Sequence, residues 1–201
     1  MLWDTSIVLI LVRHGRTPAN AAGLLQGRLD QDLDDRGRLQ ATAVAAYVQS
    51  WCEVDAVVSS PLKRAQQTAA AFGLAVETDD RWIELSYGEY EGTPHSDVPS
   101  AVWEHWRNDP HFTPAGGESL AVLDDRVRAA CDDLVERATR DNVVVVSHVS
   151  PMKSAVAWSL GVGVDISFSC HLDQAAVCRI AFRGDRPILQ TFNETAPLPN
   201  S

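Results

Sequence analysis

A histidine between two arginines follows the first apolar run of the chain, and this pattern suits phosphate chemistry. Residues 7–12 are all apolar, and Arg13, His14, Gly15 and Arg16 come directly after them. A guanidinium group offers a planar fork of donors that matches phosphate oxygens. Because Gly15 has no Cβ, we expect it to let backbone N–H groups come close to a bound anion. The motif therefore indicates a phosphate site, although by itself it is also compatible with a charged turn.

Two later apolar runs end in the same kinds of residue. Residues 54–58 lead into a segment that contains Arg64, and residues 143–146 lead to His148. Short Val-rich runs followed by helix-like stretches are typical of buried strands in a parallel sheet, and ligands bind beyond the carboxyl ends of such strands. We therefore expect three strands to bring His14, Arg64 and His148 to one edge of one sheet.

The elements that position these residues alternate between strand and helix, which predicts an α/β fold. After the first strand we expect a loop to about Asp34. Four helices are predicted: one that ends near Val48, one that begins at Pro61, one that runs from a Ser119 cap to about Arg137, and one over residues 151–160. Two further strands are predicted at 177–182 and 188–192.

The segment 84–118 has a different composition, rich in Gly, Pro, His and Trp. Such a segment is typical of an excursion above the sheet edge, where it would form the roof of the pocket. We expect its histidines and tryptophans to serve surface contacts, hydrogen bonding and packing rather than ligand binding: His95, His105, His111, Trp103 and Trp106.

Composition indicates one enzyme domain, residues 1–201. The 201 residues are 45% hydrophobic, and no linker, charge run or repeat divides them. The net charge of −10 argues against nucleic acid or an anionic membrane as a partner. The N-terminal residues carry no positive segment, so we expect a cytoplasmic protein with four reduced cysteines. No heptad or exposed apolar strand marks an interface, which leaves a homodimer open.

The motifs together resemble the histidine phosphatase superfamily, also called phosphoglycerate mutase-like, and in particular its bacterial acid and α-ribazole phosphatases. The likeness spans about residues 7 to 160 and implies a three-layer α/β/α sandwich with a mostly parallel sheet. It is carried by residues 11–17, Asn20, 26–27, Leu33, Gly37, 40–41, 59–65, Thr68, Glu84, Gly88, 91–92, 116–119 and 147–148.

The resemblance implies a role for each central residue. His14 corresponds to the nucleophile that becomes a phosphohistidine, Arg13, Arg64 and His148 to the groups that clamp the phosphoryl group, and Glu84 to the proton donor. The chemistry agrees, because a phosphoryl transition state spreads negative charge that fixed cations stabilise. Nearby arginines also keep His14 unprotonated and nucleophilic. The resemblance implies no cofactor and no metal.

One residue departs from the family pattern. The family usually has glycine after the second histidine, whereas this chain has Val149, which narrows the backbone choices there and bears on pocket shape. Lys153 lies one helical turn beyond Ser150, near the expected site. Further candidates for substrate binding are Arg16, Asn20, Gln26, Gly27 and Val149 itself, with Ser60 and Glu118 as residues that hold the site in place.

The residues favour a metal-independent phosphomonoesterase that acts on a small phosphorylated metabolite. A phosphoglycerate-type mutase is the first alternative, although the chain is compact where mutases carry longer insertions. A non-catalytic module that binds a phosphorylated ligand is the second. A metal hydrolase with His14, His148 and Glu84 as ligands is disfavoured, because the nearby arginines would repel a divalent cation.

Overall fold

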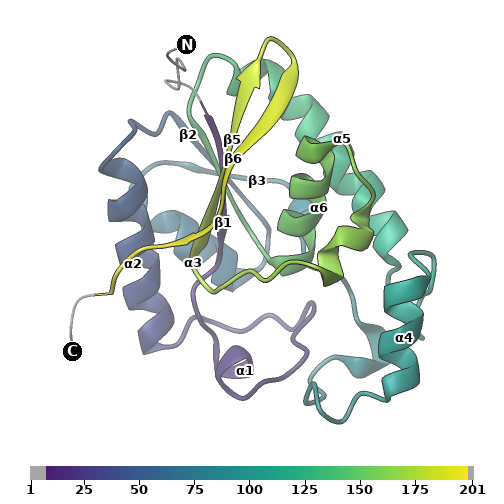
Figure 1. The fold of residues 1–201 in the computed structure, drawn as a ribbon. Coiled ribbons are helices and arrows are strands. Elements are labelled where there is room, and N and C mark those ends of the chain that lie inside the picture. The colour runs from purple at the N-terminus through teal and green to yellow at the C-terminus, as the bar shows by residue number, and fades with distance from the viewer. Residues whose placement is uncertain (1–7, 199–201) are drawn as a thin grey trace.

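The computed structural model describes residues 8–198, in which one six-stranded sheet lies between two layers of helices (Figure 1). The strand order is β3-β2-β4-β1-β5-β6. Strands β3, β2, β4 and β1 are parallel, β5 is antiparallel to β1, and β6 is antiparallel to β5. The bounds are β1 Val8–Arg13, β2 Ala56–Ser59, β3 Val76–Thr78, β4 Val143–Ser147, β5 Ala176–Arg183 and β6 Arg186–Thr195. The predicted three-layer α/β class with a mostly parallel sheet is confirmed.

The helices divide between the two faces of the sheet, with α2 and α3 on one side and α5 and α6 on the other (Figure 1). Within residues 8–198, no helix has the length and apolar composition needed to cross a bilayer. The α-helices are α1 Pro18–Ala21, α2 Asp35–Gln49, α3 Lys63–Ala70, α4 Ser100–Asn108, α5 Leu120–Ala138 and α6 Val149–Leu160, and the 3-10 turns are η1 Asp80–Trp82, η2 Gly88–Tyr90 and η3 Val164–Phe168.

Strand β1 is buried on both faces, as its continuous apolar run predicts. Leu9 and Leu11 belong to the core cluster under α5 and α6. Ile10 and Val12 belong to the cluster under α2 and α3. Successive side chains of a strand point to opposite faces, so a strand with helices on both sides must be apolar throughout. Ile7 and the N-terminal residues used to predict location lie outside the described residues.

The register of the central strands places the two histidines next to each other. Arg13 is the partner of Ser147 in the β1–β4 pairing, and the backbone N–H of His14 donates to Ser147 O at 3.0 Å. Ser60, which follows β2, donates its N–H to Val146 O at 3.0 Å. The ends of β1, β2 and β4 therefore meet at one edge of the sheet, as expected.

Three elements were not predicted, and two predicted helix starts were displaced. The expected loop to Asp34 contains α1, which is held by a capping box in which Thr17 and Asn20 bond to each other's backbone N–H at 3.2 Å. Helix α4 lies inside the segment 84–118, and β3 is a three-residue strand at the sheet edge. These elements are too short for periodicity to reveal.

The displaced helix starts have local causes. The helix expected to open at Pro61 begins at Lys63, because Leu62 keeps an extended backbone as its N-cap. Helix α6 begins at Val149, two residues before the expected Pro151. The Ser119 cap of α5 is confirmed, since its hydroxyl accepts from Val122 N at 3.2 Å.

Two glycines let the loop after β1 rest directly on α2. A Cβ on Gly15 would lie 2.4 Å from Gly37 O, and a Cβ on Gly37 would lie 2.0 Å from Arg16 O. The N–H of Gly15 donates to Thr68 Oγ1 at 3.1 Å. The N–H of Gly15 itself is therefore paired within the protein. Gly15 is required because two backbone segments come close together.

We expect Gly37→Ala to lower the free energy of unfolding by about 2 kcal/mol or more, because a backbone contact cannot move aside as a flexible side chain can. This cost outweighs the gain of about 1 kcal/mol in helix propensity. Urea unfolding checks the prediction. The control is Arg36→Ala, an exposed change on the same helix, for which we expect a change within about 0.5 kcal/mol. Equal stability of the two variants would contradict the close contact.

Candidate active site

One buried arginine joins the two histidines. Arg64 is 1% exposed, and its Nε donates to both His14 Nε2 and His148 Nδ1 at 3.2 Å. Its terminal nitrogens donate to Leu29 O at 2.8 Å and to Gly27 O at 2.7 Å. Burial lowers the pKa of Arg64 to about 10, which still leaves it charged at neutral pH. The guanidinium is therefore a fixed cation at the centre of the site.

The contacts of His14 determine which ring nitrogen carries its proton. Nδ1 lies 2.6 Å from Gly15 O, and a carbonyl can only accept, so the proton is on Nδ1. Nε2 then keeps its lone pair, which accepts from Arg64. Burial, followed by the charges of Arg64 and Arg13, holds the pKa of His14 well below its usual range. The imidazole is neutral, and the lone pair on its Nε2 faces Arg64.

His148 is neutral for the same reasons. Its Nδ1 accepts from Arg64, so its Nε2 carries the proton and donates to Ser60 Oγ at 2.7 Å. Burial lowers the pKa of His148 well below its usual range, and the charge of Arg64 lowers it further. The two imidazole rings are 5.0 Å apart between centroids. Ser60 thus holds a histidine in place, the role expected for it.

Arg13 brings a second guanidinium group with an unused donor. One terminal nitrogen donates to Leu172 O. Among residues 8–198, the buried Nε of Arg13 has no hydrogen-bond partner. Burial also lowers the pKa of Arg13. A buried unpaired donor costs about 1–3 kcal/mol, and Arg13 also lines the cavity described below.

Glu84 faces these cations from the other side of the cavity. Its side chain is buried, and Oε1 accepts from Leu85 N at 2.7 Å and from Ser150 N at 3.3 Å. Ser150 is the second residue of α6, so the carboxylate also lies at the positive end of that helix. Both bonds go to Oε1, which leaves Oε2 for a proton or a ligand.

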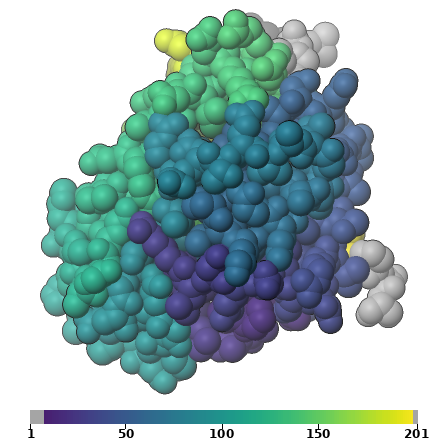
Figure 2. Space-filling view, turned by 180° about the vertical axis from the view of Figure 1, so that it is seen from behind, coloured from purple at the N-terminus to yellow at the C-terminus, as the bar shows by residue number. Residues whose placement is uncertain are grey.

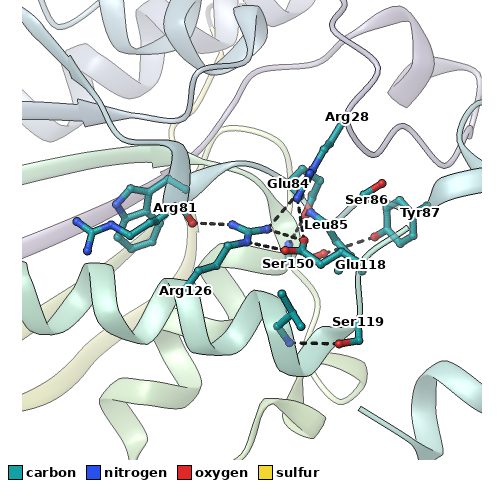
Figure 3. A network of polar contacts seen from close by, with 12 residues as sticks. Arg28, Arg81, Glu84, Leu85, Ser86, Tyr87, Glu118, Ser119, Arg126 and Ser150 are labelled. Carbon is teal, nitrogen blue, oxygen red and sulfur yellow. Dashed lines mark hydrogen bonds and ion pairs between the residues drawn. The ribbon is translucent and has the colours of Figure 1, made fainter. Parts of the chain in front are cut away.

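A network of two arginines and Glu118 holds the backbone of Glu84 (Figure 3). Arg28 Nε and Arg126 Nη2 donate to Glu84 O at 3.1 Å and 3.4 Å. Glu118 binds Arg126 through both oxygens at 2.9 Å and Arg28 at 3.0 Å. Glu118 was expected to hold the site arginines or histidines; it positions Glu84 instead. Sequence reasoning missed Arg28 and Arg126, although an arginine beside Val127 in the apolar stripe of α5 was a signal.

These side chains surround a cavity of about 240 Å³. Of the expected residues, the structure places Arg13, His14, Arg64, Glu84, Asn20, Gln26, Gly27 and Val149 in its wall. His148 is fully buried and contacts Arg64. Arg16 is not brought to the cavity wall, because its Nε donates to Asp34 Oδ2 at 2.8 Å. The guanidinium of Arg16 is therefore bound to the Asp34 carboxylate and not directed at the cavity.

Asn20 and Gln26 shape the wall through their own bonds. Thr17 donates its N–H to Asn20 Oδ1 and its hydroxyl to Gln26 Oε1, at 3.2 Å and 2.8 Å. Gly27 has a positive φ of 51° and a carbonyl that accepts from Arg64. A side chain at Gly27 would also meet Glu91. The loop after β1 is thus braced from within, and its carbonyls orient Arg64.

Lys153, expected near the site, also lies in the wall. The wall further contains residues that sequence reasoning did not assign to it, namely Leu24, Leu25, Tyr87, His95, His171 and Leu172. His95, expected at the surface or hydrogen-bonded, reaches the wall because its backbone N–H donates to Gly23 O at 3.0 Å. Leu25 and Thr93 are joined in the same way at 2.8 Å. Figure 2 shows this purple loop packed against the teal of the later segment. Such a pairing between distant segments leaves no periodic signal.

Comparisons with known proteins agree with this geometry. A family model described as the histidine phosphatase superfamily (branch 1) matches residues 9–195. Phosphoserine phosphatase 1 of Hydrogenobacter thermophilus is 36% identical over 200 residues, which are 96% of this chain and 94% of that protein.

Solved structures show the same fold. The mycobacterial glucosyl-3-phosphoglycerate phosphatase in complex with VO3 has a TM-score of 0.84 and 30% identity, covering 94% of this chain and 100% of that one. A candidate alpha-ribazole-5'-P phosphatase of Escherichia coli has a TM-score of 0.84 and 29% identity, covering 95% of this chain and 98% of that one. The chain is a member of the histidine phosphatase superfamily, branch 1, and its relatives are phosphatases.

Proposed function

We propose that this phosphatase hydrolyses phosphomonoesters without a metal ion, through a phosphohistidine on Nε2 of His14. The observation that carries the proposal is the contact of His14 Nδ1 with Gly15 O, at 2.6 Å, which leaves the lone pair on Nε2. The fixed charge of Arg64 lies against that lone pair at 3.2 Å. This arrangement supports His14 as the nucleophile and Arg64 as the cation that binds the phosphoryl oxygens.

In the first step, the Nε2 lone pair of His14 attacks phosphorus and the bond between phosphorus and the ester oxygen breaks. Arg64 and the unpaired Nε of Arg13 donate to the phosphoryl oxygens. His148 keeps Arg64 directed at the phosphoryl group, because its Nδ1 accepts from Arg64 Nε at 3.2 Å. The protonated carboxyl of Glu84 gives its proton to the leaving oxygen.

In the second step, the Glu84 carboxylate takes a proton from water. The water oxygen attacks phosphorus, the phosphorus–nitrogen bond breaks, and inorganic phosphate leaves. His14 regains its lone pair and Glu84 its proton. The hydrogen bonds that Glu84 Oε1 accepts from Leu85 and Ser150 keep the carboxyl group at one position in both steps.

The site also supports a small phosphorylated substrate and a reaction that needs no metal ion. Both imidazole nitrogens that a cation would need already accept from the Arg64 guanidinium, which would also repel it. The cavity of about 240 Å³ suits a small phosphorylated metabolite. Segment 84–118 contributes Glu84, Tyr87 and His95 to the wall, so we assign it the role of a roof over the site. The relatives act on esters named phosphoserine and glucosyl-3-phosphoglycerate.

His14→Ala should abolish phosphate release from p-nitrophenyl phosphate in the presence of EDTA, because the attacking nitrogen is gone. Wild type denatured at alkaline pH during turnover, where a phosphorus–nitrogen bond survives, should also carry one phosphoryl group by mass, and the variant none. The control is His111→Ala, which removes an exposed histidine and should leave both results unchanged. Wild-type activity that EDTA removes and zinc or manganese restores would refute the mechanism, and phosphoryl transfer between phosphoglycerates without release would indicate a mutase.

Glu84→Gln should slow esters with poor leaving groups by about 10²–10⁴-fold, the usual contribution of a general acid. p-Nitrophenyl phosphate should be affected much less in the first step, because its leaving oxygen needs little protonation. Rates for p-nitrophenyl phosphate and glycerol 3-phosphate, measured before steady state, give the comparison. Glu89→Gln changes an exposed neighbour and is the control. Equal losses for both esters would exclude the acid role.

Stability should fall as pH is lowered below about 6.5. The pKa of His14 and the pKa of His148 are depressed in the folded protein. As pH falls, the unfolded chain therefore binds protons before the folded protein does. The stability present above the unfolded-state pKa of about 6.5 is lost as pH falls toward the folded-state pKa values. Each histidine contributes a slope of up to about 1.4 kcal/mol per pH unit. Urea unfolding from pH 7.5 to 5 should show a smaller slope in His14→Asn and an unchanged slope in His111→Asn. A wild-type slope near zero would mean that both histidines titrate normally.

A further inference from the structure

A second cavity, of about 460 Å³, lies where helix α2 meets the segment before β5 and the chain after β6. Figure 1 shows the yellow chain crossing from β6 toward α2. The volume falls within the range of roughly 300–1,000 Å³ that small-molecule sites occupy. The wall is formed by Arg36 and Gln40 of α2, residues 173–175 before β5, and Thr195, Ala196 and Leu198.

This wall is hydrogen-bonded to the backbone around His14. Gln40 Oε1 accepts from the N–H of Arg16 at 2.8 Å. The N–H of Ala175 donates to His14 O at 3.2 Å. The wall therefore holds the backbone of the proposed nucleophile at one carbonyl, and the backbone two residues later at one N–H. A ligand that fixes Gln40 and Ala175 relative to each other also fixes His14.

One short segment separates the second cavity from the catalytic one. Residues 171–172 line the catalytic cavity, and residues 173–175 line the second. Ala175 has a φ of 56° and Asn193 a φ of 58°, a left-handed conformation that is uncommon for residues other than glycine. Asn193 holds the segment, because its Oδ1 accepts from Asp173 N at 2.7 Å and its Nδ2 donates to Asp173 Oδ2 at 3.0 Å. Such strained positions often accompany binding sites.

Helix α2 presents two donors to the cavity that the protein does not use. Gln40 is 9% exposed, and its bond with Arg16 fixes which end of the amide is oxygen. Within residues 8–198, its Nε2 has no hydrogen-bond partner, and this atom keeps some accessible surface. Arg36, one helical turn earlier, is exposed and forms no ion pair in the same part of the chain. A carboxylate accepts from an amide and a guanidinium at this spacing.

Asp173 brings the opposite charge from another wall. Its carboxylate accepts from Asn193 Nδ2 and lies 3.1 Å from His171 Nε2, and its side chain remains 49% exposed. A carboxylate has about four lone-pair sites, so it can accept from a further donor. No ion pair joins Asp173 to Arg36 in the described chain. The two charges therefore remain available to one molecule between them.

We propose that the second cavity binds a free α-amino acid, and that this binding strengthens the binding of a phosphate-like anion at His14. Arg36 and Gln40 Nε2 hold the carboxylate of the amino acid, and Asp173 holds its ammonium group. A simple anion would meet the like charge of Asp173, and a simple cation would meet that of Arg36. The rest of the wall is neutral, which suits an uncharged side chain. The coupling follows from the bonds of the wall to His14 and Arg16.

Calorimetry with the standard L-amino acids at millimolar concentration tests the site. We expect at least one to bind, and its carboxamide and its des-amino analogue each to bind about tenfold or more weakly, because each lacks one charge. Arg36→Ala and Asp173→Asn should each lower the affinity by a similar factor. The control is Arg38→Ala, which removes an exposed arginine of the same helix outside the wall and should bind as wild type does. Thermal unfolding confirms that each variant is folded.

The coupling is measured with orthovanadate, which mimics the phosphoryl group. The bound amino acid should raise the affinity for orthovanadate by about fivefold or more, and orthovanadate should raise the affinity for the amino acid by the same factor. Binding of no amino acid, or equal binding of an amino acid and its carboxamide, would overturn the site. A coupling factor of one would overturn the link to His14. Neither measurement needs turnover, so both results stand apart from whether the protein releases phosphate.

Discussion

The burial of one guanidinium group is the constraint around which the site is arranged. A charge that is 1% exposed must be hydrogen-bonded on all sides, and Arg64 meets this need with two imidazoles and the carbonyls of Gly27 and Leu29. These contacts fix the loop after β1, and they oblige the facing nitrogens of His14 and His148 to accept. The same interaction therefore sets the position of His14, the proposed nucleophile, together with its tautomer and its neutral state.

The carboxylate half of the site is built separately from the cationic half. Glu84 lies in a segment without regular secondary structure, and its backbone is held by Arg28 and Arg126, which share Glu118. The pairs are half-buried, so their electrostatic attraction is screened less than that of surface pairs. These hydrogen bonds thereby hold an irregular segment in one position. The cavity lies where this ionic network faces the strand ends.

Much of the fold was predictable, because the information is local and repeated. The apolar runs of β1 and β4, the stripe of α5 and its Ser119 cap each depend on neighbours within a few residues. The misses are short elements or contacts between distant segments. Helix α1 has four residues and β3 has three, so each covers little more than one period of its pattern, which is too few repeats to recognise. Arg16 illustrates the second kind, because its ion pair with Asp34 depends on how the loop between them is folded.

The sequence by itself determined the α/β class and the set of residues at the strand ends, because a parallel sheet delivers whatever follows its strands to one edge. It identified His14, Arg13, Arg64, Glu84 and His148 as a group. Only the tertiary structure decided the tautomers of the histidines and the bracing of Glu84. These features depend on which atoms meet across segments far apart in the chain, and no residue type or spacing encodes such meetings before the chain is packed.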